Sequence, residues 1–458
     1  MVDNDAAVQD GPGASTDAST VQDAPGSSTD SSTGDVSSDG GGAAIKWHPG
    51  QYMSSGVYTE LGNVDESSNP AGPEKASEIS LVRSGPSQVL GWEGYYFWRS
   101  MENAEDTYDM SSAGSGLDAD YAAITGYTSG SGSSAVYSSP RRMGIYILHT
   151  DYFNANPSAR AVPNYLLDNA TYGPIGPDGT YYGYWTTTGS GGTGTGSVVA
   201  FWRPVVEARY VALLSGLAKH VLPDGYTVDA SPYVEWVKLF LESADSPELT
   251  TDSSYNVTEY LAQLEALNLA AASAFPHTNV VCTINWLDDP NDIVTLSDSL
   301  ATHRSGSGGP DIAGYSSGQN FNDNGGIAGL TWGQMAYIGL LPPSSGNTWV
   351  TGGTDKRGVV PYLGTIQNTE TVYNGSHNYT PADLFEQANA TLKATHVAWQ
   401  NVSGQTGSLA AANWLGTASS LATWSASTSG GVLAEVVNST LATTACPSSY
   451  ANGCNMSP

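Results

Sequence analysis

Residues 91–99, GWEGYYFWR, run on through MENAEDTYDM at 101–110 to LDADYAAI at 117–124, and this stretch decides the fold that we expect. Its first part is apolar and aromatic, which predicts a strand buried on both faces. Its last part has the composition of a helix. A buried strand that leads into a helix is one βα unit, from which parallel sheets are built.

The same alternation continues along most of the chain. Eight segments have the composition of buried strands, and they are residues 45–53, 89–99, 141–150, 234–243, 279–287, 310–316, 358–367 and 394–401. Helix-like runs lie at residues 117–127, 205–221, 258–275, 332–341 and 381–394. Eight such units predict an α/β fold, a closed (β/α)8 TIM barrel with long loop insertions. The alternative is an open doubly wound sheet, although no G-x-G-x-x-G motif follows any of these strands.

The charge of the chain restricts its partners. Its 44 acidic and 15 basic residues give a net charge of −29, which argues against nucleic acids and anionic membranes because both need a basic surface. Neutral and cationic partners remain open. The low charged fraction of 13% and the 53 glycines are typical of an exported protein.

The two ends of the chain differ in composition from its middle. Residues 1–45 contain eight Asp and no Lys or Arg among Ser, Thr and Gly, which predicts a disordered acidic linker. We therefore expect a barrel over residues 46–430 and a C-terminal extension over residues 431–458. The linker resembles those that follow the cleaved signal of bacterial exported or surface lipoproteins. That resemblance implies a secreted or cell-surface protein with a lipid anchor upstream, and no apolar run in the sequence is long enough to span a membrane.

The three cysteines point the same way. Cys446 and Cys454 are eight residues apart in a Gly/Pro/Ser-rich segment, a spacing that suits a disulfide-clamped loop and favours an oxidising compartment. Cys282 lies in the apolar run NVVCTINWL and is expected in the core, with a reactive thiol as the alternative.

The end of the strand at residues 89–99 carries a family resemblance. Trp98-Arg99 close the strand, Glu102 follows, and Tyr108-Asp109 precede the helix. The segment resembles the W-x-x-x-E-x-x-x-G-x-Y-D-F region of the retaining β-glycosidases, the (β/α)8 superfamily that includes β-galactosidases and cellulases. The resemblance implies hydrolysis of a β-linked poly- or oligosaccharide by carboxylate general acid/base catalysis. The alternative is that Tyr108 and Asp109 only cap a helix.

Candidate catalytic carboxylates follow from the same resemblance. The family places its acid/base glutamate at the end of the fourth strand, a position that Glu242 takes here, whereas Glu235 starts that strand and belongs to the opposite end. A helix first-turn role is the alternative for Glu242. The family's nucleophile ends the seventh strand, where this chain has Gln367, so Asp311 or Glu370 is the expected second carboxylate.

Side chains at the predicted strand ends suit a sugar, because tryptophan rings stack on sugars while amides and Arg bind hydroxyl groups. The expected substrate-binding residues are Trp47, His48, Glu93, Arg99, Asp151, Asn285, Trp286, Gln367 and Trp399. Alternatively, the tryptophans only close the core, and a carboxylate beside Arg99 is an ion-paired positioning group.

Other chemistries have less support. The seven histidines show no H-E-x-x-H spacing, so we expect neither a metal nor another cofactor. Two non-enzymatic functions stay open. One is a surface-tethered barrel that binds carbohydrate without cleaving it, which the missing strand-seven glutamate favours. The other is a structural surface protein.

Overall fold

The computed structural model describes the chain from residue 44 to residue 457, and several connecting segments within that range lie outside the described residues. These segments are 56–72, 112–113, 150–160, 173–183, 189–194, 240–254, 285–286, 288, 310–311, 313–329, 343, 345–348, 368–380, 401–435 and 437–438. Residues 1–43 of the predicted linker also lie outside them, and the division into three segments stays a prediction.

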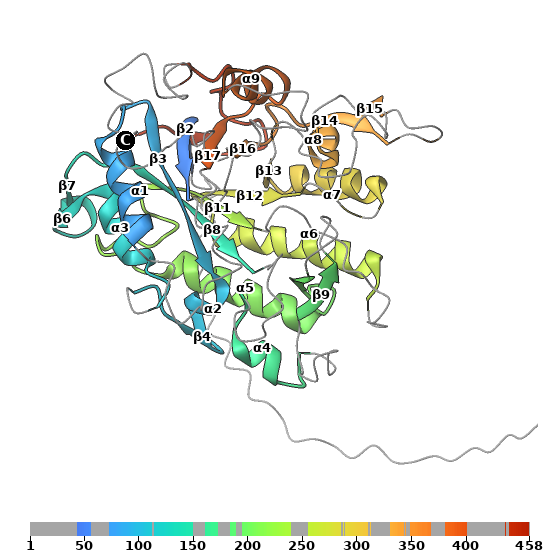
Figure 1. Ribbon diagram of the computed structural model, residues 1–458, viewed down its shortest axis with the longest axis horizontal. Coiled ribbons are helices and arrows are strands. Elements are labelled where there is room, and N and C mark those ends of the chain that lie inside the picture. Colours follow the sequence, from blue (N-terminus) through green and yellow to red (C-terminus); the bar gives the residue numbers. More distant parts are fainter. Residues whose placement is uncertain are drawn as a thin grey trace, which may run out of the picture. The chain divides into compact units, whose positions relative to one another are not determined.

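Eight parallel strands close into a barrel (Figure 1). In chain order they are β2 (Gly50–Ser54), β3 (Val89–Phe97), β8 (Arg142–Leu148), β11 (Val234–Leu239), β12 (Asn279–Thr283), β13 (Gly306–Gly309), β16 (Tyr362–Gln367) and β17 (His396–Gln400). Each strand pairs with the next, and β17 pairs with β2 to complete the ring. The predicted (β/α)8 barrel is therefore confirmed.

Helices surround the barrel in Figure 1, as βα connectivity requires. The main ones are α1 (Pro73–Ser84), α3 (Leu117–Thr125), α5 (Pro204–Lys219), α6 (Val257–Ala274), α7 (Pro290–Thr302), α8 (Trp332–Tyr337) and α9 (Pro381–Glu386), which continues as a π-helical turn (Gln387–Thr391). Capping residues in the local sequence determine where several of these helices begin. The Asn256 side chain caps α6, Asp289 caps α7 ahead of Pro290, and Thr331 with Gln334 forms a capping box at α8.

Shorter elements lie in the connections between the barrel strands and the main helices. They are α2 (Trp98–Met101), α4 (Asn164–Asp168) and the antiparallel pairs β4 (Glu102–Ala104) with β5 (Thr107–Tyr108), β6 (Tyr127–Ser129) with β7 (Val136–Tyr137), β9 (Tyr184–Thr188) with β10 (Thr195–Val199), and β14 (Ile338–Leu341) with β15 (Val350–Asp355).

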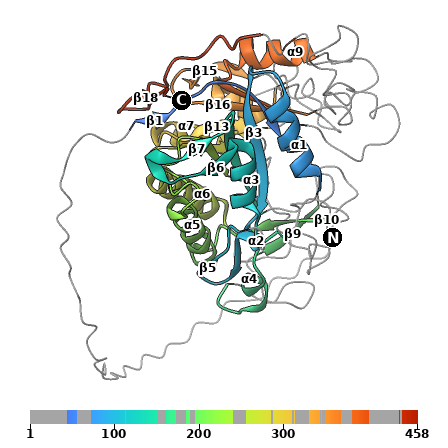
Figure 2. The same cartoon turned by 90° about the vertical axis from the view of Figure 1, so that its left-hand side faces the viewer.

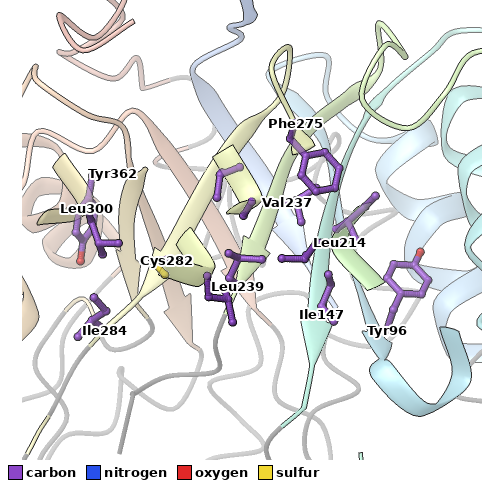
Figure 3. Close-up of a cluster of buried hydrophobic side chains, with 14 of the residues drawn as sticks. Tyr96, Ile147, Leu214, Val237, Leu239, Phe275, Cys282, Ile284, Leu300 and Tyr362 are labelled. Atoms are coloured by element: carbon purple, nitrogen blue, oxygen red, sulfur yellow. The ribbon is translucent and has the colours of Figure 1, made fainter. Parts of the chain in front are cut away.

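The main hydrophobic core lies between the strands and the helices. Figure 3 shows Val237 and Leu239 of β11 beside Leu214 of α5, and Cys282 of β12 in the same layer. Cys282 is fully buried, and its Sγ donates to Asn268 Oδ1 of α6 at 2.9 Å. Its predicted place in the core is confirmed. The layer accounts for the apolar composition of the strands, because their outward faces are covered by helices.

Two of the predicted strands are placed differently in the structure. The sixth strand is β13, with the sequence GSGG, and not residues 310–316. Glycines look like loop residues, but here they allow close packing, since a Cβ on Gly306 would lie 2.7 Å from Pro361 and one on Gly308 would lie 2.8 Å from the carbonyl oxygen of Leu363. The predicted first strand is divided into β1 (Ile45–Lys46), which lies outside the barrel, and β2. The sequence also gave no prediction of α1 or α7.

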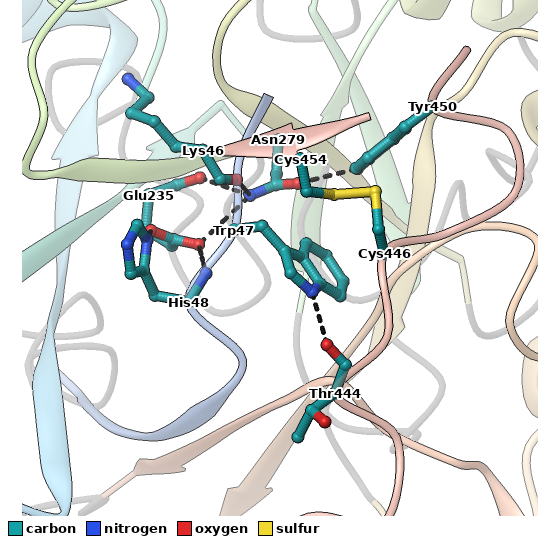
Figure 4. Close-up of a disulfide and its surroundings, with 9 residues drawn as sticks. All are labelled: Lys46, Trp47, His48, Glu235, Asn279, Thr444, Cys446, Tyr450 and Cys454. Atoms are coloured by element: carbon teal, nitrogen blue, oxygen red, sulfur yellow. Dashed lines mark hydrogen bonds and ion pairs between the residues drawn. A yellow bond between two sulfur atoms is a disulfide. The ribbon is translucent and has the colours of Figure 1, made fainter. Parts of the chain in front are cut away.

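The two ends of the described chain meet beneath the barrel. β1 pairs in parallel with β18 (Cys454–Asn455), and the two strands lie side by side in Figure 2. Cys446 and Cys454 form a disulfide, and the Tyr450 hydroxyl donates to Asn279 Oδ1 at 2.7 Å (Figure 4). Because Asn279 starts β12, this segment covers the amino-terminal end of the barrel.

Candidate functional site

Several long connections follow the carboxyl ends of the barrel strands. At the carboxyl ends of the strands, residues 55–72 join β2 to α1, 240–256 join β11 to α6, and 310–331 join β13 to α8. At the amino ends, residues 85–88, 275–278 and 303–305 are enough for three of the return connections, whereas residues 126–141, 220–233 and 338–361 form longer ones. Barrel enzymes build their sites from the connections at the carboxyl end. The candidate site therefore lies at the carboxyl end, opposite the covered amino-terminal end.

A buried carboxylate occupies the barrel interior below that end. The Glu93 side chain of β3 is fully buried, and its Oε1 accepts a hydrogen bond from Ser54 Oγ of β2 at 2.8 Å. Its Oε2 accepts a hydrogen bond from the Trp236 indole of β11, also at 2.8 Å. Glu93 thus connects strands on both sides of β3, and its position is set by two neutral donors.

The Trp236 indole can reach Glu93 because the strand that separates them has a glycine beneath the indole. β8 lies between β3 and β11, and a Cβ on its Gly144 would lie 2.2 Å from the indole Cε2. The indole therefore covers Gly144 on its way to Glu93. Tyr52 packs edge-on against the same ring, with centroids 4.6 Å apart. These contacts hold the indole N–H toward the carboxylate.

Lys238 of β11 lies in the same layer of the interior. Lys238 is 1% exposed, and its Nζ lies 3.6 Å from Glu93 Oε1. The ammonium donates to Thr365 Oγ1 of β16 at 3.0 Å and lies 4.2 Å from the ring centroid of Tyr146. A buried charge needs such partners to offset the loss of hydration.

Tyrosine and amide groups continue this network toward the carboxyl end. The Tyr95 hydroxyl lies 3.0 Å from Ser54 Oγ and accepts a hydrogen bond from Gln400 Nε2 at 2.7 Å. Its ring packs edge-on against Tyr146, with centroids 4.8 Å apart. Ser54, Glu93, Tyr95, Lys238 and Gln400 therefore form one connected polar layer.

The end of β12 carries a buried hydroxyl without a hydrogen-bond partner among the described residues. Thr283, the last residue of β12, is fully buried, and within the described residues its Oγ1 makes no hydrogen bond. A buried hydroxyl without a partner costs stability.

The amino-terminal end contains a second polar cluster, centred on Glu235. His48 Nδ1 lies 2.8 Å from Glu235 Oε2, and His396 Nε2 lies 3.5 Å from Oε1. Arg142 Nη1 lies 3.6 Å from Oε2. Burial alone would raise the pKa of Glu235, but hydrogen bonds and charge from the two histidines hold it well below its usual range. The predicted place of Glu235 at the start of its strand is confirmed.

Lys46 lies beside this cluster in a fully buried position. Its Nζ donates to the backbone oxygens of Asp229 and Ser231 at 2.7 and 2.8 Å. Burial lowers the pKa of Lys46 to about 7, although the carboxylates of Asp229 and Glu235 act in the opposite direction. Lys46 is therefore a lysine that titrates near neutral pH.

Three predicted substrate-binding residues do not contribute to the interior at the carboxyl end. Trp47 and His48 precede β2, so they belong to the amino-terminal end, where the Trp47 indole donates to the Thr444 carbonyl (Figure 4). Their expected position was wrong because the segment was taken as one continuous strand. Trp399 points away from the barrel axis, donates to Gln51 Oε1 at 3.0 Å and stacks on Phe385 of α9. Its alternative role in closing the core fits this packing.

Three of the remaining candidates lie in the described part of the chain, and the others lie outside it. Glu93 faces the barrel interior with Lys238 as its charged neighbour, whereas Arg99 lies in α2, where its N–H donates to the Ala161 carbonyl. Gln367 is the last residue of β16. Six candidates lie outside the described residues, namely Glu242, Asp311, Glu370, Asp151, Asn285 and Trp286.

Sequence reasoning missed Lys238, Tyr95, Tyr146 and Thr365. Lys238 could have been found, because it is the one charged residue in the otherwise apolar run WVKLFL and lies two positions after Trp236. Two residues along a strand return to the same face. The partners of Lys238 come from β3, β8 and β16, and no local pattern reveals them.

No cluster of three His, Cys, Asp or Glu side chains among the described residues could hold a metal ion. None of the helices in the described part of the chain is long and apolar enough to cross a membrane.

Comparisons with known proteins give a distant likeness. No protein-family model matches this chain, and no curated protein matches its sequence. Among solved structures, that of Aspergillus fumigatus Ega3 in complex with galactosamine is similar to 57% of this chain and 75% of its own, at 11% identity and a TM-score of 0.26. A likeness of this degree carries no argument about function, which has to come from the residues of this barrel.

Proposed function

We propose that this protein is a glycoside hydrolase that cleaves a β-linked poly- or oligosaccharide by carboxylate general acid/base catalysis. The observation that carries the proposal is where the barrel strands end. Glu242 follows Leu239, the last residue of β11, by three positions, and β11 is the fourth barrel strand. Catalytic groups of (β/α)8 enzymes come from the carboxyl ends of strands. Glu242 is therefore the proposed proton donor.

The second carboxylate has two candidates at comparable positions. Asp311 follows the end of β13 by two residues, and Glu370 follows the end of β16 by three. Two carboxyl groups about 5 to 5.5 Å apart give retention of the anomeric configuration, and about 6.5 to 9.5 Å gives inversion. Arg99, Asp151, Asn285, Trp286 and Gln367 are the proposed substrate contacts.

The polar layer inside the barrel supports a function at this end. Barrel interiors are usually filled by branched apolar side chains, yet here Glu93 and Lys238 occupy the layer below the carboxyl end. Local departures of this kind concentrate at functional sites.

The test compares the full chain with its Glu242→Gln, Asp311→Asn and Glu370→Gln variants on β-glucans, xylans, mannans and galactans. Released sugars are measured by mass spectrometry, and the anomeric form of the first product by NMR. We expect release by the parent, near-total loss in Glu242→Gln, and loss in one of the other two variants. Glu265→Gln, an exposed change on α6, is the matched control.

The outcomes separate the alternatives. Binding of a glycan without release by the parent would replace the proposal with the non-catalytic carbohydrate-binding barrel. Neither binding nor release would favour a structural surface protein. Release that survives Glu242→Gln would refute the assigned proton donor.

We also propose that the protein is secreted or displayed on the cell surface, with a lipid anchor upstream of the linker. The Cys446–Cys454 disulfide supports this location, because such bonds persist in oxidising compartments. Thiol titration of the denatured protein, taken directly from its source cells, should find one free thiol, that of Cys282. Three free thiols would argue for a reducing compartment.

A further inference from the structure

A line of polar contacts crosses the barrel interior. It runs from Glu93 of β3 through Lys238 of β11 to Thr365 of β16, with 3.6 Å between Glu93 Oε1 and Lys238 Nζ and 3.0 Å between Lys238 Nζ and Thr365 Oγ1. All three side chains are at most 1% exposed. We call these three residues the cross-barrel tie. It joins strands that are not neighbours in the sheet, since β12 and β13 separate β11 from β16.

Stability alone gives little reason for such a tie. Removing two charges from water costs about as much as their attraction returns, and apolar side chains of similar size often stabilise a core at least as well. Apolar packing is present one layer below, where Trp236 of β11 and Leu363 of β16 cluster with Val281 of β12. The tie is therefore better explained by what it holds in place.

The strands that the tie joins lead to the carboxylates of the proposed reaction. Lys238 is the penultimate residue of β11, and Thr365 lies two residues before the end of β16. We propose that Lys238 is a positioning residue whose bonds to Glu93 and Thr365 fix the separation of the carboxyl ends of β11 and β16. This inference rests on the proposed glycosidase function, because the two ends precede Glu242 and Glu370. A displacement of about 1 Å between reacting groups costs on the order of a hundredfold in rate.

Thr365→Val is the mildest way to break the tie. Valine keeps the branched shape of threonine and removes only the hydroxyl that accepts from Lys238. We expect kcat to fall at least tenfold while KM stays within twofold, because the change alters positioning and leaves the substrate contacts in place. Thr365→Ser restores the hydroxyl and should return kcat to within threefold of the parent.

The matched control is Thr395→Val at the opposite end of the barrel. Thr395 is 1% exposed, and its hydroxyl donates to the Tyr362 carbonyl at 3.1 Å. The Thr395→Val variant thus loses a buried threonine hydroxyl, as Thr365→Val does, and should keep the kcat of the parent. An equal fall of kcat in Thr365→Val and Thr395→Val would overturn the proposal, because general loosening of the barrel would then explain both.

Hydrogen exchange followed by mass spectrometry tests the tie without any substrate. In Thr365→Val we expect faster exchange in residues 234–239 and 362–367 than in the parent. Unchanged exchange of both strands in Thr365→Val, or a kcat equal to that of the parent, overturns the tie. If the parent releases no sugar from any substrate, the proposed function fails, and the exchange rates alone decide whether the tie holds the strands.

Discussion

The titration of Lys46 predicts an unusual pH dependence of stability. Burial lowers the pKa of Lys46 from 10.5 to about 7 in the folded protein. Between these values the unfolded chain binds a proton at Lys46 that the folded protein releases, so stability rises with pH across this window. One pKa unit corresponds to about 1.4 kcal/mol, which gives a rise of about 3 kcal/mol between pH 7 and pH 9.5. About one unit below pH 7 and further down, both states hold the proton and this contribution no longer changes.

The comparison with Lys46→Met isolates this contribution. Methionine keeps the length of the stem and cannot titrate, so the variant should lack the rise between pH 7 and pH 9.5. Its free energy of unfolding at pH 7 is not the readout, because the variant also loses two hydrogen bonds to backbone carbonyls. Tyrosines of the unfolded chain, whose ordinary pKa is about 10, begin to ionise in this range, but they do so equally in the parent and in Lys46→Met, so their effect cancels in the comparison.

The assay is urea unfolding, followed by tryptophan fluorescence and extrapolated to zero urea at each pH. Lys219→Met, which removes an exposed lysine at the end of α5, controls for net charge and should follow the parent. Equal pH slopes of the free energy of unfolding in the parent and in Lys46→Met would refute the assigned pKa of Lys46.

Further predictions concern other parts of the barrel. Gly144→Ala places a Cβ against the Trp236 indole and should destabilise by about 3 kcal/mol or more, seen in the urea midpoint and in altered Trp fluorescence. Thr283→Val removes a buried hydroxyl without a partner and should raise Tm, by an amount equivalent to about 1 kcal/mol, whereas a fall in Tm would show that the hydroxyl is satisfied. The parent should lose stability as pH falls below about 4.5, where the Glu235 carboxyl of the unfolded chain takes up a proton; Glu235→Gln should be less stable at pH 7 and show less of this loss. Attachment to a bead through either chain end should leave glycan binding intact, because β1 and β18 lie at the covered end of the barrel.

Much of the frame follows from local sequence. Runs such as residues 141–150 and 279–287 are apolar because helices cover their outward faces while the barrel interior takes their inward side chains, so periodicity alone predicts buried parallel strands. Helix starts were predictable where a cap is local, as at Asn256. β13 was not, because GSGG becomes a strand only through the close approach of Pro361 and Leu363.

The sequence by itself determined the barrel class, the buried Cys282 and the end of the barrel to which Glu235 belongs, because each depends on residues close together in the chain. Only the tertiary structure decided that Trp47 and His48 lie beneath the barrel, that Trp399 faces the helices and that Glu93 is paired with Lys238. Closure of the ring brings β3, β11 and β16 together around one axis. Contacts across that axis join residues more than a hundred positions apart, and no local pattern encodes them.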